Sequence, residues 1–238
     1  MSVTHKVLIL VLQAAVVFSA LLQVQKCKIS DSNCIKSSAQ STVPVFVAGI
    51  AELNSEVLDS MLVDKINVDL AGLKLNMQNA EITGLKNAVI DKMKIDMGRK
   101  HLQLVFHADL MLKALYKASG RLFILPISGD GQTVIQLKNC ELSMEFPFDI
   151  VKNNDGKDIM DLKSYTYKYD VKDGANFHLT NLFNGNKAAS DVIHSFMNSS
   201  WKLLTEEFGI PVFNTPTQKI FDTIKAYLKS QPLDEITV

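Results

Sequence analysis

Apolar and polar residues alternate with a period of two over much of the chain between residues 65 and 182. Because successive side chains of a strand point to opposite faces of its sheet, this alternation predicts half-buried β-strands in hairpin order. Glycines between the alternating runs, at Gly72, Gly84, Gly98 and Gly120, indicate turns or bulges. The apolar positions of the first runs are Leu73, Leu75, Met77, Met93, Ile95, Met97, Leu102, Leu104, Phe106, Ala108, Leu110 and Leu112.

Further strands are predicted up to residue 169. We interpret the run Leu125-Pro126-Ile127-Ser128-Gly129-Asp130-Gly131 as a hairpin connection between two of them, after which residues 136–150 alternate clearly. Residues 153–156 (Asn-Asn-Asp-Gly) predict the next turn, and Tyr165, Tyr167 and Tyr169 then share one face of another strand. Strands this long cannot stay flat, so we expect a strongly curled antiparallel sheet with one buried face.

The apolar period changes to about 3.6 in three other segments, which predicts helices. The longest covers residues 181–208, and Gly209 and Pro211 are expected to end it. Thr215-Pro216, with Gln218 in the capping-box position, is expected to open a C-terminal helix. The stripe of the long helix is Ala189, Val192, Ile193, Phe196, Met197, Trp201, Leu204 and Phe208, and that of the last helix is Ile220, Phe221, Ile224, Tyr227 and Leu228.

A first amphipathic helix is predicted within residues 37–61 and is expected to end near Ala51. The residues at helical spacing in this segment are Val43, Phe46, Val47, Ile50, Leu53, Val57 and Leu58. The stripe of the 181–208 helix needs a large partner surface, and only the strand-rich region offers one. We therefore predict an α+β fold in which the long helix lies against, or inside the curl of, an extended antiparallel sheet.

The N-terminus has the pattern of a secretory signal peptide. Lys6 precedes an apolar run over residues 7–22, which is shorter than the roughly 20 strongly apolar residues of a membrane span and exits through small residues. Cleavage is expected near Ala20, with an uncleaved anchor as the alternative. The expected product is a secreted chain with a single domain over residues 21–238 and no stable membrane insertion.

Cysteine usage fits that compartment. Cys27 and Cys34 lie just after the expected cleavage point, and we predict that they form a disulfide, because oxidising compartments preserve such bonds. Cys140 is left over on the apolar side of an alternating run. An unpaired cysteine there is expected to be a small buried hydrophobe rather than a reactive thiol.

The charge balance and the polar motifs predict no catalytic, metal or cofactor site. The 238 residues include 25 Lys and Arg and 25 Asp and Glu, so the chain lacks the basic excess typical of proteins that bind nucleic acid or anionic membranes. The histidines include no pair at helical metal-ligand spacing, and there is no Gly-x-Ser-x-Gly motif of a serine hydrolase. Asn198-Ser199-Ser200 fits a glycosylation sequon, but its position within a helix beside Trp201 leaves its use open.

A surplus of apolar side chains remains, including the adaptable methionines Met77, Met93, Met97 and Met144. Periodicity alone allows two interpretations of this surplus. The residues form either a solid core or the lining of a cavity for an apolar ligand.

The sequence resembles the Takeout and juvenile hormone binding protein family of secreted insect proteins. The resemblance rests on four features in the same order over nearly the whole chain, followed by a matching Pro232-Leu233-Asp234-Glu235. They are the pair Cys27 and Cys34; Gly49-Ile50-Ala51-Glu52-Leu53; Tyr116 with Gly120 and the run Leu125-Pro126-Ile127-Ser128-Gly129-Asp130-Gly131; and Leu182-Phe183-Asn184-Gly185-Asn186-Lys187 with Asp191, Phe196, Asn198 and Trp201. It implies a tubular lipid-binding fold: a long helix wrapped by a curved antiparallel sheet that encloses an elongated apolar tunnel.

The function implied by this resemblance is non-catalytic carriage of a fatty acid, another lipid or a juvenile hormone-like terpenoid, by a monomer in haemolymph or sensory fluid. The single Cys140 implies that a second disulfide of the hormone-binding branch is absent, which favours a generic lipid over juvenile hormone. Rival functions are a solid-cored protein-interaction module and a secreted hydrolase. We expect the ligand to enter at one end and to contact Phe46, Ile50, Leu104, Phe106, Leu142, Met144, Phe146, Ile193, Phe196, Trp201, Phe221 and Ile224.

Overall fold

The computed structural model describes residues 24–238, so the predicted signal peptide over residues 1–20 lies outside the described residues. Within them, one sheet of seven antiparallel strands has the order β1-β2-β4-β5-β6, with β3 paired to β4 and β7 paired to β5. The strands are β1 (Met61–Leu70), β2 (Leu73–Thr83), β3 (Val89–Asp96), β4 (His101–Leu122), β5 (Leu125–Lys152), β6 (Asp158–Leu162) and β7 (Thr166–Leu179). The helices are α1 (Ser32–Val47), α2 (Lys187–Ser199), α3 (Trp201–Ser230) and α4 (Leu233–Ile236), with short 3-10 turns η1 (Ala51–Leu53), η2 (Leu85–Asn87) and η3 (Phe183–Gly185).

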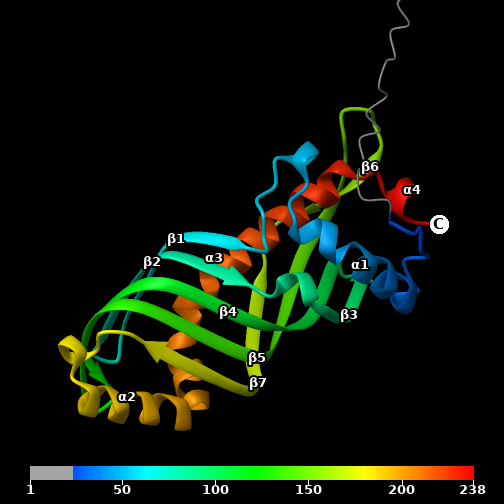
Figure 1. The fold of residues 1–238 in the computed structure, drawn as a ribbon. Helices are drawn as coiled ribbons and strands as arrows, with labels where there is room; N and C mark the ends of the chain where they lie inside the picture. Colours follow the sequence, from blue (N-terminus) through cyan, green and yellow to red (C-terminus); the bar gives the residue numbers. More distant parts are fainter. Residues whose placement is uncertain (1–23) are drawn as a thin grey trace, which may run out of the picture.

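The sheet curls around α3, as the alternation predicted, and α3 crosses its concave side (Figure 1). Strand β4 buries every second residue over most of its 22 positions, and it pairs with β5 along its whole length. Aromatic rings join the two layers: Phe146 of β5 stacks on Phe221 of α3 at 6.2 Å between ring centroids, and Tyr169 of β7 stacks on Phe213 at 4.4 Å. The core therefore lies between the sheet and one long helix.

The predicted hairpin connection at residues 125–131 is wrong, because these residues begin β5 and the turn is formed by Phe123 and Ile124. Gly129 and Gly131 are needed for close approach rather than for a turn. A Cβ at residue 129 would lie 2.4 Å from the Tyr116 hydroxyl, and one at residue 131 would lie 2.6 Å from Thr180 Oγ1. The first strand also begins earlier than predicted, at Met61.

The predicted boundaries of the long helices are wrong as well. The segment from residue 181 to 208 breaks at Ser200, and α3 then continues without interruption through Gly209, Pro211 and Pro216 to Ser230. Proline inside a helix removes one backbone hydrogen bond and costs about 3 kcal/mol. That cost is offset because α3 buries twelve residues along its length, from Leu204 to Leu228.

The first helix begins and ends earlier than predicted. Asp31 caps it, since its carboxylate accepts hydrogen bonds from the backbone N–H groups of Asn33 (3.1 Å) and Cys34 (3.0 Å). The chain leaves α1 after Val47, where Gly49 adopts a φ of +90°. The Ile50 and Leu53 positions, which matched the helical period, therefore belong to a separate turn.

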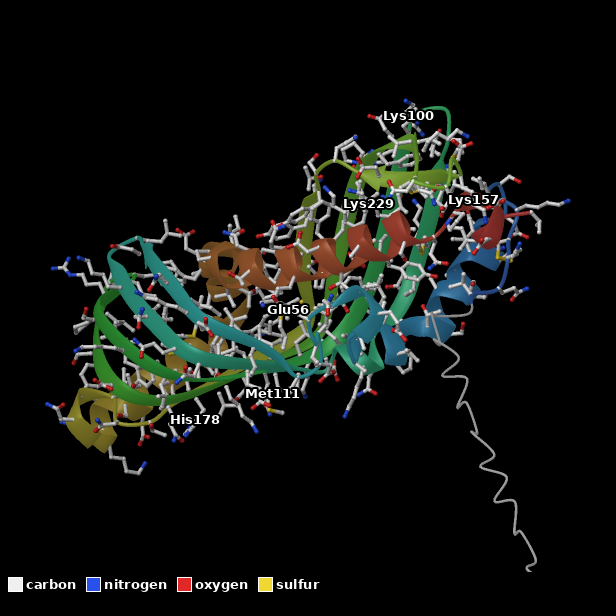
Figure 2. The ribbon with its side chains drawn as sticks, turned by 90° about the horizontal axis from the view of Figure 1, so that it is seen from above. Glu56, Lys100, Met111, Lys157, His178 and Lys229 are labelled. Carbon is white, nitrogen blue, oxygen red and sulfur yellow. A yellow bond between two sulfur atoms is a disulfide. The ribbon has the colours of Figure 1, made fainter. Side chains whose placement is uncertain are left out.

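The two ends of the elongated molecule differ: α1, α4 and the C-terminus gather at one end, and α2 covers the other (Figure 1). Figure 2 shows the same division, with Lys157 near the first end and His178 near the second. The predicted disulfide between Cys27 and Cys34 is confirmed. Cys27 also pairs through its backbone with Ile236 and Val238, so the start of the described chain is tied to its end.

Cys140 is buried without a disulfide partner within residues 24–238, as predicted. Burial raises the pKa of its thiol to about 12, with smaller contributions from the negative charges of Asp170 and Glu141. The thiol is therefore uncharged and inert at neutral pH. Of the helices in the described part of the chain, none is both long and apolar enough to cross a membrane.

Candidate functional site

An apolar cavity of about 190 Å³ lies at the end of the molecule that carries both described chain ends. Its walls come from α1, from β3 and β4 of the sheet, and from the C-terminal half of α3. None of the described residues that line it carries a charged side chain. Its principal walls are Ile35, Ala39, Thr42, Val43 and Phe46 from α1; Ile90, Met93, Ile95, Leu104 and Phe106 from the sheet; and Ile220, Ile224 and Tyr227 from α3.

The side chain of Gln40 holds α1 to the sheet by forming hydrogen bonds with backbone groups at the start of β3, as a neighbouring strand would. The Gln40 carboxamide donates from Nε2 to the Ala88 carbonyl (3.0 Å), and its Oε1 accepts from the Ile90 N–H (2.6 Å). Ala88 and Ile90 flank the start of β3, whose pairing partner in the sheet is β4. Because Gln40 satisfies backbone groups of this strand, α1 is fixed over the cavity by polar bonds at its rim.

A second, smaller apolar cavity of about 40 Å³ lies further along α3, towards the centre of the molecule. Leu85 and Ile220 line both cavities and form the wall between them. Leu85 is held in η2, where the Asp59 carboxylate accepts hydrogen bonds from the N–H groups of Gly84 (3.0 Å) and Lys86 (2.7 Å). The other residues that line this second cavity include Leu110, Leu112, Ile135, Leu137, Leu142, Phe213 and Pro216.

Polar groups are scarce around the large cavity, and most of them are paired within the protein. The hydroxyl of Ser38 donates to the Gln25 carbonyl (3.1 Å), that of Thr42 to the Ala39 carbonyl (2.7 Å), and that of Thr237 to the Leu233 carbonyl (2.6 Å). The Tyr227 hydroxyl is buried without a hydrogen-bond partner in the described part of the chain. Burial raises the pKa of Tyr227 to about 12.

Five of the twelve predicted ligand contacts lie at the cavity walls. Phe46, Leu104, Phe106 and Ile224 line the large cavity, and Leu142 lines the small one. Met144, Phe146 and Phe221 are buried in the core between sheet and α3, outside both linings, and Ile50 is buried beyond the end of α1. Alternation had identified the buried face of the sheet correctly, but part of that face packs directly against α3, as the stacking of Phe146 on Phe221 shows.

The remaining three predicted contacts belong to the opposite end of the molecule. Ile193 is a buried residue of α2, Phe196 packs edge-on against Phe123 at 6.1 Å between ring centroids, and Trp201 begins α3. Asn198 has a structural role there, since its Oδ1 accepts from the Phe177 N–H (2.7 Å) and its Nδ2 donates to the Phe177 carbonyl (3.3 Å). Glycosylation at Asn198 stays a prediction, and it would use the nitrogen that contacts β7.

Several wall residues were not assigned to the site from the sequence. Val43 belonged to the predicted stripe of the first helix, Met93 and Ile95 to the alternating runs, and Tyr227 to the stripe of the last helix. Their spacing showed that they are buried, but it did not distinguish a cavity wall from a packed core. Ala39 and Thr42 gave no signal, because small residues leave space without adding to a hydrophobic stripe.

The polar chemistry of the rest of the described chain is ordinary. Residues 24–238 contain no group of three or more His, Cys, Asp or Glu side chains placed to hold a metal ion. Tyr116, at the other end of the molecule, donates to the Thr180 carbonyl (2.6 Å), and Tyr169 donates to the Thr205 carbonyl (2.8 Å). The distinctive site is therefore the apolar cavity under α1 with its one unpaired hydroxyl.

Comparison with known proteins shows which family has this architecture. The sequence model of the haemolymph juvenile hormone binding protein family matches residues 7–238. The chain belongs to this family. The crystal structure of Takeout 1 from Epiphyas postvittana superposes with a TM-score of 0.87 at 43% identity, covering 90% of this chain and 99% of that one. The family thus accounts for the curled sheet around a long helix.

Two other relatives are less similar in sequence. The circadian clock-controlled protein daywake of Drosophila melanogaster is 28% identical over 224 residues, which is 89% of this chain and 85% of that protein. The juvenile hormone-binding protein of Manduca sexta is 29% identical over 93 residues, which is 38% of this chain and 41% of that protein.

Proposed function

We propose that the protein is a secreted, non-catalytic carrier that holds one hydrophobic small molecule in the cavity under α1. The observation that supports this most strongly is the cavity of about 190 Å³ whose described lining has no charged side chain. An apolar cavity of roughly 150 Å³ in another protein stays free of water and binds benzene, so a cavity of this kind favours an apolar guest. A protein-interaction module with a solid core would not contain such a cavity.

The ligand classes are a fatty acid, another lipid or a juvenile hormone-like terpenoid. Membership of a haemolymph juvenile hormone binding family supports the last of these and also supports an extracellular location, in haemolymph or sensory fluid. The disulfide between Cys27 and Cys34 is consistent with secretion. Burying about 400 Å² of apolar ligand surface gains roughly 10 kcal/mol, and subtracting association costs of at least about 4 kcal/mol leaves at most about 6 kcal/mol, which corresponds to a Kd of some tens of micromolar.

Native mass spectrometry tests the proposal without a guess about the ligand. The full chain is expressed in insect cells, and the secreted monomer is sprayed under native conditions and again after denaturation. A carrier should show a mass excess that disappears on denaturation and extracts as an apolar molecule. Absence of any excess, together with no displacement of a fluorescent fatty-acid or terpenoid probe, would favour the solid-core module instead.

A matched pair of variants on α1 locates the ligand. Ala39→Trp should fill the cavity and abolish the mass excess, because Ala39 forms part of its wall. Val45→Trp introduces the same side chain on the outer side of the same helix, where Val45 is 52% exposed, and should retain the excess. Equal retention by both folded variants would place the ligand elsewhere.

A further inference from the structure

The Tyr227 side chain combines two features that packing alone does not explain. It lines the large cavity from α3, next to Phe46, whose ring it meets edge-on at 6.5 Å between centroids. Its hydroxyl is buried and has no hydrogen-bond partner among residues 24–238. Buried polar groups in folded proteins are nearly always paired, so the partner of this hydroxyl is expected to be a molecule held in the cavity.

The chemistry of that partner follows from the hydroxyl and from the charges around it. Burial raises the pKa of Tyr227 to about 12, so the hydroxyl keeps its proton at physiological pH and can donate it to an acceptor oxygen. The described lining contains no Lys or Arg side chain to compensate a carboxylate. An ionised fatty acid would therefore bring an unpaired charge into an apolar site, whereas an ester or a ketone would not.

We propose that the cavity selects uncharged apolar molecules with one acceptor oxygen, such as an ester or a ketone, and that Tyr227 Oη donates the hydrogen bond that fixes this oxygen. This inference rests on the proposed carrier function and narrows its ligand class. The oxygen would lie at the α1–α3 side of the cavity, with the hydrocarbon part against the β3 and β4 wall formed by Met93, Leu104 and Phe106.

Three compounds of similar length separate the effects of an acceptor oxygen, a negative charge and a hydrocarbon chain on affinity. They are the ester methyl decanoate, the carboxylate decanoate and the alkane undecane. Each is titrated at pH 7.4 against the full mature protein by displacement of the fluorescent apolar probe N-phenyl-1-naphthylamine. Tyr227→Phe removes only the hydroxyl and keeps the ring that packs against Phe46. Tyr116→Phe is the matched control, because its hydroxyl is paired with the Thr180 carbonyl and Tyr116 lines neither cavity.

Tyr227→Phe should weaken methyl decanoate binding about fivefold, the usual value of one neutral hydrogen bond, and leave undecane binding unchanged or slightly stronger. Tyr116→Phe should leave the ratio of ester to alkane affinity as it is in the unmodified protein, and decanoate should bind more weakly than its ester. An unchanged ratio in Tyr227→Phe would mean that water alone satisfies the hydroxyl, and equal weakening of ester and alkane would mean a packing role. Either result overturns the inference while undecane binding upholds the carrier function.

Failure of the probe and of all three compounds to bind the unmodified protein would overturn the carrier function itself, and this inference with it. Thermal unfolding of both variants, compared with the unmodified protein, establishes that each variant folds. Loss of a hydroxyl that has no protein partner should not lower the midpoint for Tyr227→Phe. Tyr116→Phe should lower it, since it breaks the bond to Thr180.

Discussion

Gly209 occupies a position in α3 where the ring of Tyr169 leaves no room for a side chain. A Cβ at this position would lie 2.4 Å from the Tyr169 hydroxyl oxygen and 2.7 Å from the adjoining ring carbon. The same tyrosine donates to the Thr205 carbonyl at 2.8 Å and stacks on Phe213. The glycine therefore allows β7 to pack closely against α3, which joins the sheet to the helix that it surrounds.

Gly209→Ala should destabilise the protein by about 1–3 kcal/mol, because the added methyl group pushes the Tyr169 ring away. Alanine favours a helix over glycine by about 1 kcal/mol, so an exposed site would show the opposite sign. Urea unfolding monitored by circular dichroism measures the change. Gly98→Ala, in the exposed turn between β3 and β4, is the control and should stay within about 0.5 kcal/mol.

The clash can be separated from a general effect on α3 by removing the tyrosine. In a Tyr169→Ala background, Gly209→Ala should become neutral or stabilising, since the group that the methyl contacts is gone. A stabilising effect of Gly209→Ala in the unmodified background would contradict the close-packing explanation.

Local residue signals and tertiary packing disagree most clearly over the helices. Local sequence suggests that a helix ends at Gly209 and Pro211 and that another begins at Thr215-Pro216. Nevertheless, α3 continues through all of these residues. Burial of its apolar positions against the sheet outweighs the propensity costs, and sequence spacing cannot measure that surface in advance. The hairpins β1–β2, β3–β4, β4–β5 and β5–β6, the Asn-Asn-Asp-Gly turn and the tyrosine face of β7 were predictable because they depend on short-range alternation and turn chemistry. The predicted hairpin order is wrong elsewhere, because β2 pairs with β4 and β7 pairs with β5, and local alternation does not show which strands become neighbours across the sheet.

At the scale of single elements, α2 is attached to β7 by a small set of polar bonds. His194 Nε2 accepts from the Leu179 N–H at 3.0 Å, and its ring stacks on that of His178 at 5.3 Å between centroids. Asn198, one turn further along, pairs with both backbone groups of Phe177. Because Nε2 must be unprotonated to accept this bond, the docking of α2 requires neutral His194.

The pKa of His194 is lowered from its ordinary value of 6.5, first by burial and then by the neighbouring His178; the Leu179 and Ser190 backbone groups and Asp191 oppose the shift. The unfolded chain therefore binds this proton more readily than the folded one, and stability rises with pH in that range. The contribution of His194 is complete above about pH 6.5. It is lost as the pH falls from there through the lowered folded-state pKa.

Hydrogen exchange over residues 187–199, corrected for the intrinsic pH dependence, should thus show α2 opening more often at pH 5.5 than at pH 7.5. His194→Ala should raise opening at both pH values and remove most of the difference between them. The exchange of β4, which lies away from this contact, is the internal control. Equal protection of α2 at the two pH values in the unmodified protein would refute the role of His194.

Across the whole molecule, the packing along α3 changes from one end to the other. Two cavities lie in line along the helix, with Leu85 and Ile220 between them, and at the end under α2 the ring of Phe123 packs edge-on against those of Phe196 and Phe208. The family resemblance implied an elongated tunnel along this same axis. Where the space lies could not be predicted, because alternation reports which face is buried, and whether facing side chains meet depends on their shapes in three dimensions.

The wall between the cavities should set the length of ligand that binds well. Each further methylene buried in an apolar site strengthens binding roughly fourfold, so affinity along a series of linear methyl esters should rise until the chain meets Leu85 and Ile220 and then level off. Ile220→Ala removes most of one side of this wall and joins the large cavity to the small one. In this variant the rise should continue for several more carbons before it levels off.

Ile224→Ala is the matched control, because Ile224 lines the large cavity alone and its truncation adds similar volume without opening the wall. Both variants should lose about 2–5 kcal/mol of stability, so circular dichroism must establish that each remains folded during the titrations. A shift of the plateau in Ile220→Ala but not in Ile224→Ala would show that the wall measures ligand length. The same shift in both variants would instead mean that added volume anywhere in the large cavity is sufficient, and that the two cavities do not form one binding path.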